Sequence, residues 1–372
     1  MSVKILVAGD FCPQRRVAEK FEYGDFQYVL GEIKDKLSET DYSLVNLECP
    51  VVKGVESPIS KQGPNLKCSE KGIEAVKWAG FSCVTLANNH FLDYGEEGVA
   101  NTFEACKKYS LDTVGGGRNL IEASKILYKD IKGKRIAIVN CCEHEFSIAT
   151  DNTAGANPLN PVKQYYSILE AKKKADFVLV IVHGGHEHFQ LPSPRMVETY
   201  RFFVDAGADA VINHHQHCYS GYEKYLGKYI FYGLGNFCFD KVHIQHGLWN
   251  EGYMVMLELE SSSINITLYP FHQCGKKPKI ELLQSETYKE RLAELNRIIC
   301  TPSLLKEKIN SYYDECSCQY SDLFEPLSWR YYLGAKRRGW LPSFISKKRK
   351  LLATNYITCE SHRDKLLRWF EK

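Results

Sequence analysis

Short apolar runs alternate with amphipathic segments along the first 235 or so residues, and this alternation constrains the fold more than any other feature of the chain. The apolar runs are rich in β-branched residues, as buried strands are, and the segments between them repeat apolar residues at helical spacing. An alternation of this kind is typical of an α/β domain with a largely buried sheet. The pattern predicts strands at residues 5–8, 44–47, 83–86, 136–139, 177–182 and 210–212, with helices near 29–37, 73–76, 99–106, 160–174 and 195–206.

The pattern changes after about residue 250. Two apolar segments, 253–260 and 264–269, flank a run of three serines, which predicts a hairpin and hence an antiparallel addition to the sheet. From residue 280 onward the chain carries helical patterns without polar residues at strand ends. A Gly-Lys-Lys-Pro turn marks the predicted boundary between a first domain, residues 1–275, and a basic, mainly helical extension, residues 276–372.

Side chains that bind metals or move protons follow directly on the predicted strands. Ligands of open α/β sheets bind beyond the carboxyl ends of the strands, so these side chains are expected to meet at one edge. Six of the twelve histidines lie between residues 183 and 217, and imidazole with carboxylate suits Zn, Mn or Fe. We therefore predict a metal-capable site from the residues at the strand ends, which are Asp10, Glu48, Asn88, Asn89, His90, His183, His214, His215 and His217.

Composition and the amino-terminal residues limit the class of protein. Hydrophobic residues make up 44% of the chain and charged residues 25%, as in ordinary soluble globular proteins. The first apolar run is too short for a secretory signal, and no stretch reaches bilayer-spanning length. The fourteen cysteines are irregularly spaced without a Cys-x-x-Cys, which favours free thiols over disulfides or a zinc ribbon. We therefore expect a cytoplasmic protein.

A set of short motifs resembles, in order and spacing, the capsule-synthesis CapA family over about residues 3–245. That family is similar to the calcineurin-like metallophosphoesterases. The resemblance therefore implies a metallophosphoesterase-like α/β sandwich with a dinuclear metal site, here followed by the mainly helical extension. The motifs are Gly9-Asp10, Asn46-Leu47-Glu48-Cys49-Pro50, Ala87-Asn88-Asn89-His90, Asp93-Tyr94-Gly95, His183-Gly184-Gly185-His186-Glu187, His214-His215-Gln216-His217 and Gly235-Asn236-Phe237.

The resemblance also implies a role for individual residues. His90 would be the catalytic general acid that protonates the leaving group. The implied cofactor is a divalent metal, Mn, Fe or Zn, bound as one or two ions. The implied ligands are Asp10 and His217 for a first metal, Asn89, His183 and His215 for a second metal, and Glu48 as the carboxylate that bridges them.

This chain departs from the phosphoesterase pattern at three positions. Cys12 stands where an Asp-x-His motif has its histidine, Glu48 replaces the usual bridging Asp, and Asn213 replaces a glycine before the last histidine pair. The first metal therefore lacks one expected ligand, unless Cys12 or a more distant residue supplies it.

Six further residues are expected to orient the ligands or to contact the substrate. His186 and Glu187 could equally be ordinary loop residues, and the alternative for Asp93 and Asn236 is turn formation. His214 is expected to support the site without binding metal, because its side chain should point opposite to that of its neighbour. Lys61 and Lys67, on the loop after the second strand, either contact an anionic substrate or are solvated. The six are Asn88, Asp93, His186, Glu187, His214 and Asn236.

The expected role is in making or exporting an anionic capsular polymer or exopolymer of the poly-γ-glutamate type, as the resemblance implies. The expected chemistry is metal-dependent hydrolysis of a phosphoester. One alternative is hydrolysis of an amide in a γ-glutamyl polymer, since the same chemistry acts on a carbonyl. Another is a non-catalytic capsule-assembly component that binds polymer or a partner protein.

The end of the chain is strongly basic. Residues 326–372 hold twelve Lys and Arg against three Asp and Glu, whereas the whole chain has a net charge of only +3. Aromatic residues are interleaved with the cations, which favours contact with an anionic membrane surface or with an acidic polymer. The alternative is a solvated basic helical appendage. Nucleic acid ranks last because no nucleic-acid motif accompanies the basic residues.

Overall fold

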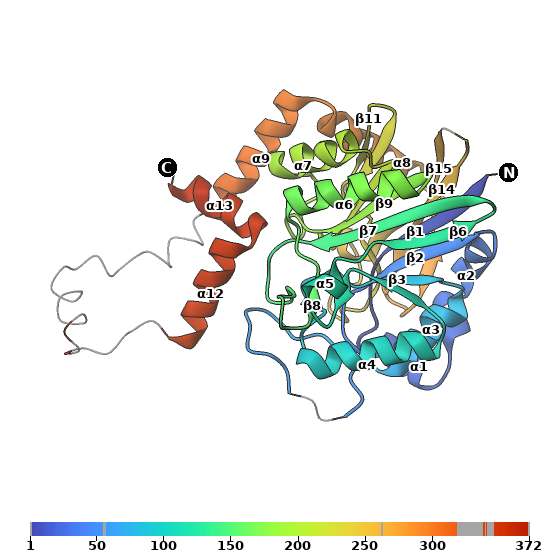
Figure 1. Ribbon diagram of the computed structural model, residues 1–372, viewed down its shortest axis with the longest axis horizontal. Helices are drawn as coiled ribbons and strands as arrows, with labels where there is room; N and C mark the ends of the chain where they lie inside the picture. Colours follow the sequence, from blue (N-terminus) through green and yellow to red (C-terminus); the bar gives the residue numbers. More distant parts are fainter. Residues whose placement is uncertain are drawn as a thin grey trace.

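The structure, a computed structural model, describes residues 2–54, 57–261, 263–317, 338, 340 and 346–370. Two β-sheets pack face to face, and the predicted α/β sandwich is confirmed (Figure 1). The first sheet runs in the order β16 (Ile280–Leu282), β15 (Ile264–Gln273), β14 (Glu251–Leu259), β1 (Val3–Cys12), β2 (Tyr42–Leu47), β3 (Cys83–Thr85) and β4 (Asp112–Val114), and β13 (Asn236–Phe239) also pairs with β1. The second runs β11 (Tyr222–Tyr225), β12 (Lys228–Phe231), β10 (Ala210–His214), β9 (Phe177–His183), β7 (Lys134–Cys142) and β6 (Leu127–Ile131).

Both faces of the first sheet are buried, which explains why its strands are apolar throughout and do not alternate with polar residues. Val3, Ile5 and Val7 of β1 face the core between the two sheets. Leu6 and Ala8 face the opposite core, under the helices. Those helices are α1 (Arg15–Glu22), α2 (Phe26–Ser38), α3 (Glu70–Ala79) and α4 (Gly95–Lys108).

The second sheet is covered on its outer face by α6 (Pro161–Lys174) and α7 (Pro194–Asp205). Their buried residues belong to the same hydrophobic cluster as the residues between the sheets. Proline occupies the first turn of each helix, and the preceding Asn160 and Ser193 accept hydrogen bonds from backbone N–H groups of that turn. Smaller elements complete the domain: α5 (Leu120–Ala123), the 3-10 helix η1 (Leu248–Asn250), and the pair β5 (Gly116–Gly117) with β8 (Gly155–Ala156).

Parallel pairing determines where the strand ends lie. In the first sheet β1, β2, β3 and β4 are parallel, and in the second β7, β9, β10 and β12 are parallel. The carboxyl ends of neighbouring strands therefore come together, and His183 at the end of β9 stands beside His214 at the end of β10. One detail differs from the sequence prediction. Asp10 does not end its strand, because β1 continues to Cys12 after a register irregularity beyond Asp10.

The last third of the chain combines strands and helices. The predicted hairpin is confirmed, with β14 and β15 antiparallel from Leu259–Ile264 to Glu251–His272. The helical prediction for residues from 280 onward is wrong at β16, because these residues extend the sheet by pairing with β15. The division of the chain into a first domain and a separate domain of residues 276–372 stays a prediction. Among the described residues that follow, the helices are α8 (Glu286–Ile299), α9 (Pro302–Ser317), α12 (Lys347–Thr358) and α13 (Glu360–Phe370).

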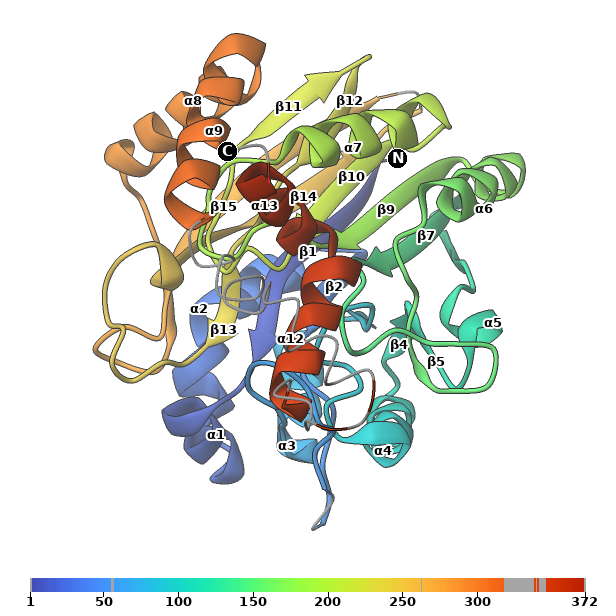
Figure 2. The same cartoon turned by 90° about the vertical axis from the view of Figure 1, so that its left-hand side faces the viewer.

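The C-terminal helices occupy two places on the sandwich. Buried residues of α8 and α9 belong to the same hydrophobic cluster as those of α6 and α7. Helices α12 and α13, drawn in red, lie at the edge of the molecule where the parallel strands end (Figures 1 and 2). Much of the basic segment 326–372 falls outside the described residues, although α12 and α13 are described. No helix in the described ranges combines the length and apolar character that crossing a bilayer requires.

Candidate metal centre

Six of the predicted site residues converge at the strand ends. We call them the strand-end cluster. All six side chains are buried although all are polar or ionisable, an arrangement that is costly unless each group has a partner. The members are Asp10, Glu48, Asn89, His183, His215 and His217, with 0–6% of each residue exposed.

A glycine permits the closest approach of backbones in this region. A Cβ atom at Gly9 would lie 1.9 Å from the carbonyl oxygen of Gly235, and Gly235 itself has a positive φ of 80°. The backbone N–H of Asp10 donates to this carbonyl at 3.2 Å, and Asp10 pairs with Asn236. Glycine at both positions therefore lets β13 bring the Asn236 side chain up to the cluster.

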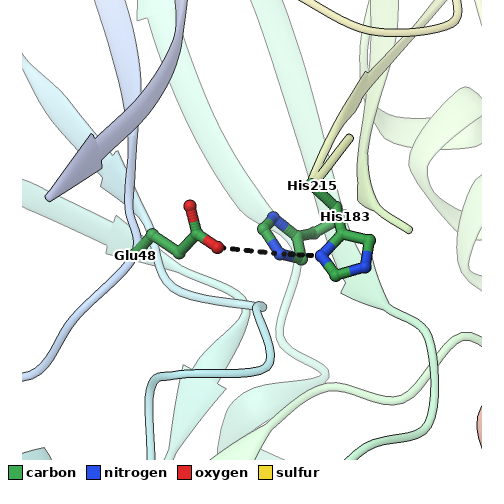
Figure 3. Close-up of side chains that lie close together, drawn as sticks. All are labelled: Glu48, His183 and His215. Atoms are coloured by element: carbon green, nitrogen blue, oxygen red, sulfur yellow. Dashed lines mark hydrogen bonds and ion pairs between the residues drawn. The ribbon is translucent and has the colours of Figure 1, made fainter. Parts of the chain in front are cut away.

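Glu48 lies at the centre of the cluster, just beyond β2. Its Oε1 atom is 3.7 Å from Nε2 of His183 and 3.6 Å from Nε2 of His217. Figure 3 shows the carboxylate directed at the imidazole rings of His183 and His215. Within the described residues, neither oxygen of this fully buried carboxylate has a hydrogen-bond partner. This carboxylate lies between two sets of imidazoles and has no described hydrogen-bond partner of its own. It is therefore suited to bind one cation together with each set.

The first set consists of Glu48, His183 and His215, whose ligand atoms lie within 4.8 Å of one another. Nε2 of His183 is 3.0 Å from Oδ1 of Asn89 and 3.1 Å from Nδ1 of His215. Three atoms that carry lone pairs thus meet at one point, where one ring proton cannot satisfy them all. A cation would satisfy them together, and this set matches the ligands implied for the second metal.

The second set consists of Asp10, Glu48 and His217, again with ligand atoms within 4.8 Å. Nδ1 of His217 is 2.9 Å from Oδ1 of Asn236, whose amide nitrogen donates to the carbonyl oxygens of His217 and Trp249 at 3.1 Å each. Oδ1 of Asn236 thus accepts a hydrogen bond from Nδ1–H of His217, and Nε2 of His217 faces Glu48. This set matches the ligands implied for the first metal.

The loop that carries the last two histidines has an uncommon backbone. His215 and His217 have φ angles of +91° and +54°, in a region that residues with side chains seldom adopt. Each such residue costs on the order of 1–3 kcal/mol. The backbone N–H of His215 donates to Oδ2 of Asp10 at 3.2 Å, so the loop is tied to β1. Strained backbone of this kind concentrates at functional sites.

Burial shifts the protonation of the cluster toward neutral side chains. It raises the pKa of the Asp10 carboxyl to about 6 and the pKa of Glu48 well above its ordinary value. It also lowers the pKa of His217 to about 3 and the pKa of His183 well below its ordinary value. Neutral imidazoles are the form that binds metal, and a cation would offset the burial of the carboxylate charges. The residues present therefore fit one or two divalent cations.

His90 lies beside the cluster in a buried network of its own. Its Nδ1 atom is 2.7 Å from Oδ2 of Asp93 and 3.0 Å from Nζ of Lys61, and Lys61 pairs with the other oxygen of Asp93. The Lys61 side chain is only 3% exposed, so the expectation of a solvated lysine is wrong. Burial lowers the pKa of His90, although the hydrogen bond to Asp93 raises it.

Three other residues predicted to support the site have different neighbours. Asn88 donates to Oδ1 of Asn46 and to the carbonyl of Leu47, which anchors the start of the loop that carries Asn89. Glu187 is about half exposed beside His188. His186 turns away from the cluster, because its Nε2 is 3.0 Å from the hydroxyl of Tyr313 on α9.

His214 lies beside Asp10, with Nδ1 3.7 Å from Oδ1. Neither ring nitrogen has a hydrogen-bond partner in the part of the chain that the structure describes. Cys12 is buried next to the cluster, but among the described residues it belongs to no group of three candidate ligands.

Sequence reasoning missed Asn46, which connects the two halves of the cluster. Its amide nitrogen lies 2.7 Å from Oδ1 of Asp10 and 3.2 Å from Nδ1 of His183. Thr85 and Asn88 hold its Oδ1 atom at 3.2 and 3.3 Å. Its position inside β2, two residues before Glu48, is the signal that could have identified it, because side chains two apart in a strand share a face.

The fold and the site define a class of α/β protein in which helices cover the outer faces of two packed sheets, with buried carboxylates and imidazoles at the strand ends. The chain belongs to the family described as bacterial capsule synthesis protein PGA_cap, whose model matches residues 4–241. The resemblance found in the sequence is thereby confirmed.

Named relatives agree with the family. The chain is 36% identical over 243 residues to the "Capsule biosynthesis protein CapA" of Bacillus anthracis, which covers 63% of this chain and 59% of the relative. It is 33% identical over 236 residues to the "PGA biosynthesis protein CapA" of Bacillus subtilis. The match covers 63% of this chain and 62% of the relative. The matched region therefore spans about three fifths of each relative's length.

Similar solved structures are more distant. A 5'-nucleotidase precursor from Thermus thermophilus is 11% identical with a TM-score of 0.43, covering 79% of this chain and 58% of that one. A hypothetical protein from the same organism is 16% identical with a TM-score of 0.45. The match covers 73% of this chain and 99% of that one. Likeness at this level carries nothing over to the site.

Proposed function

We propose that the chain is a metal-dependent hydrolase that acts on a phosphoester in the synthesis of a capsule or exopolymer of the poly-γ-glutamate type. The observation that carries the chemistry is the Glu48 carboxylate, buried without a hydrogen-bond partner in the described residues and within 3.7 Å of both His183 and His217. Membership of a family described by capsule synthesis supports the biological setting.

The strand-end cluster would hold Mn, Fe or Zn, with Glu48 shared between two ions. When bound, such cations lower the pKa of water and stabilise negative charge on the oxygens of the group that is cleaved. Asn46 and Asn236 keep the ligand side chains in position through the hydrogen bonds described above. The burial of the cluster excludes bulk water, which strengthens each electrostatic contact within it.

His90 is the candidate for proton transfer to the leaving group. The contact of 2.7 Å between Nδ1 of His90 and Oδ2 of Asp93 supports a hydrogen bond that Nδ1–H donates, since a carboxylate oxygen accepts. Nε2 is then the atom that exchanges a proton with the substrate. Lys61 fixes Asp93 from its other side and so holds the ring in one orientation.

The test combines metal analysis with turnover of a chromogenic phosphodiester by protein loaded separately with Mn, Fe or Zn. We expect bound metal and turnover in the wild type, and loss of both in His217→Ala. His246→Ala, an exposed histidine outside the cluster, is the matched control and should behave as wild type. Absence of both metal and turnover from the wild type, with no effect of His217→Ala, would exclude the hydrolase.

Two alternatives have support of their own. The name of the Bacillus subtilis relative refers to PGA biosynthesis, which supports a γ-glutamyl polymer as the substrate and cleavage of its amide as the reaction. Release of shorter fragments from such a polymer, without turnover of the phosphodiester, would identify that reaction. The absence of Cys12 from any described ligand group favours a non-catalytic component that binds polymer or a partner. Polymer binding that survives His217→Ala, without any turnover, would identify that role.

We also propose a cytoplasmic location with peripheral contact at the inner membrane face through the basic end of the chain. Helix α12 begins with Lys347, Lys348, Arg349 and Lys350, which supports contact with anionic headgroups. Co-sedimentation with vesicles containing anionic lipid should fall when Lys347 and Lys348 are both changed to Glu. Equal sedimentation of wild type and variant would remove the membrane contact and leave an acidic polymer as the partner to test.

A further inference from the structure

A second group of metal-ligating side chains lies at the junction between α12 and α13. Helix α12 ends at Thr358, Cys359 follows as its C-cap, and α13 begins at Glu360. Cys359 and His362 form a Cys-x-x-His spacing across this junction. Their ligand atoms and a carboxylate oxygen of Glu145, from the loop after β7, all lie within 4.8 Å of one another. We call these three residues the junction site.

The geometry of the junction site suits zinc. The Sγ atom of Cys359 lies 3.8 Å from Oε1 of Glu145. With Zn–S of about 2.3 Å, Zn–O of about 2.1 Å and a tetrahedral angle, the sulfur and oxygen ligands of one ion are roughly 3.6 Å apart. Sulfur, imidazole nitrogen and carboxylate oxygen are the three donor types that protein zinc sites use. Three protein ligands also leave a fourth position for water or substrate.

The junction is held against the sandwich by contacts that do not involve the three ligands. Glu360 accepts a hydrogen bond from the backbone N–H of His144 at 2.9 Å and lies 2.6 Å from its Nδ1 atom. Asp364 pairs with Arg195 at 3.1 Å. The loop that carries Glu145 and the helix junction that carries Cys359 and His362 are therefore fixed relative to each other before any ion binds.

The junction site also adjoins the strand-end cluster. Oε1 of Glu145 lies 3.9 Å from Nε2 of His215, so a single imidazole ring separates the two groups. Cys359 is fully buried, and the Glu145 side chain is 14% exposed. Both Cys359 and His362 lie outside residues 4–241, to which the family model extends. The extension of this chain therefore brings ligands to the edge of the family's site.

We propose that Glu145, Cys359 and His362 bind a zinc ion, separate from the ions of the strand-end cluster, which ties α12 and α13 to the mouth of that cluster. The site requires no hydrolase activity, so it stands or fails independently of the proposed function. The ion joins the loop after β7 to the C-terminal helices, and its removal should loosen those helices while the sandwich persists.

The first test measures zinc in the full chain after removal of all metal and reloading with zinc alone. Cys359→Ser with His362→Ala should bind one zinc fewer per chain than the wild type, and Glu145→Gln should weaken the same ion. The matched control is Cys300→Ser with His243→Ala, which changes an exposed cysteine and an exposed histidine away from the site. Circular dichroism confirms that each variant is folded before its zinc is counted.

The second test replaces zinc with cobalt and records the near-ultraviolet charge-transfer band that a thiolate ligand produces. The wild type should show this band, His362→Ala should weaken it, and Cys359→Ser should abolish it. Cys12→Ser should leave it unchanged, which distinguishes the junction site from a thiolate ligand within the strand-end cluster. An absent band, a band lost in Cys12→Ser alone, or equal zinc in the wild type and the double variant would overturn the proposal.

Discussion

The two candidate metal sites are adjacent but are built in different ways. The strand-end cluster takes its ligands from the ends of strands in two packed sheets. A hydrogen bond donated by Asn46 and one accepted by Asn236 orient them. The junction site takes two of its three ligands from one helix junction, which ion pairs and hydrogen bonds hold in place. The first site therefore depends on the core of the fold, whereas the second depends on the docking of α12 and α13.

This difference has a consequence for stability. Ligands that project from central strands cannot separate without unfolding the sheets, because those strands contain the most buried residues of the chain. Ligands on a docked helix pair can separate by local opening, at a smaller free energy. Substitutions near one site should therefore spare the other. The expected effects decrease from Glu48→Gln through Arg195→Met and Asn46→Ala to Arg368→Ala.

The largest effect is expected from Glu48→Gln. Loss of the shared carboxylate should remove the strand-end ions and reduce hydrolysis on the order of 10³-fold, since several kcal/mol of charge stabilisation are lost. Zinc at the junction site should remain. In the metal-free protein the same substitution should leave stability unchanged or raise it, because it removes an unpaired buried carboxylate. Metal analysis, turnover and thermal unfolding with and without metal measure the three effects. A Glu48→Gln protein that keeps all its metal would show that Glu48 is not a ligand.

Arg195→Met should destabilise the docking of α13. The arginine side chain is 22% exposed and pairs with Glu143 at 2.8 Å and Asp364 at 3.1 Å, so the substitution leaves two carboxylates without their cation. We expect a loss of about 3 kcal/mol in the free energy of unfolding, measured by chemical denaturation. The exposed pair of Arg118 with Glu122 provides the control, and Arg118→Met should have little effect. Equal effects of both variants would argue against a docking role for Arg195.

Asn46→Ala should weaken the strand-end cluster without removing a ligand. Asp10 and His183 lose the amide that positions both, which typically costs 10- to 100-fold, as an order of magnitude, in metal affinity or activity. Metal affinity is measured by competition with a chelating dye, and junction zinc should be unaffected. Asn265→Ala, at an exposed asparagine, serves as the control. Unchanged affinity in Asn46→Ala would mean that the ligands are positioned by the sheets alone.

Arg368→Ala should have the smallest effect. The ion pair of Arg368 with Asp314 joins α13 to α9 at 2.8 Å, but both side chains are partly solvated, at 29% and 43% exposure. Such pairs contribute under about 1 kcal/mol. Denaturation should therefore detect little change in the unfolding free energy, and both metal sites should stay intact. A loss comparable to that of Arg195→Met would mean that α13 is held mainly from α9 and not from the sandwich.

Most of the strand-end cluster was predictable because its causes are local. Val45 and Leu47 belong to an apolar strand, and the polar residue that follows such a strand lies at the edge of the sheet. Asn46 was missed because a polar side chain within a strand usually faces solvent, and only its spacing of two residues from Glu48 places it on the face of the cluster. Lys61 was misjudged because its burial depends on Asp93, thirty-two residues away in the chain.

The sequence by itself determined the alternation of strands and helices and the chemistry at the strand ends, since both follow from residue patterns only a few positions long. Only the tertiary structure decided that Glu48 lies between two sets of imidazoles, because that requires two sheets to pack with their carboxyl edges together. It also decided that Glu145 meets Cys359 and His362, which are more than two hundred residues away along the chain. Contacts between residues this far apart in the sequence depend on how helices dock, and a local sequence pattern cannot predict that.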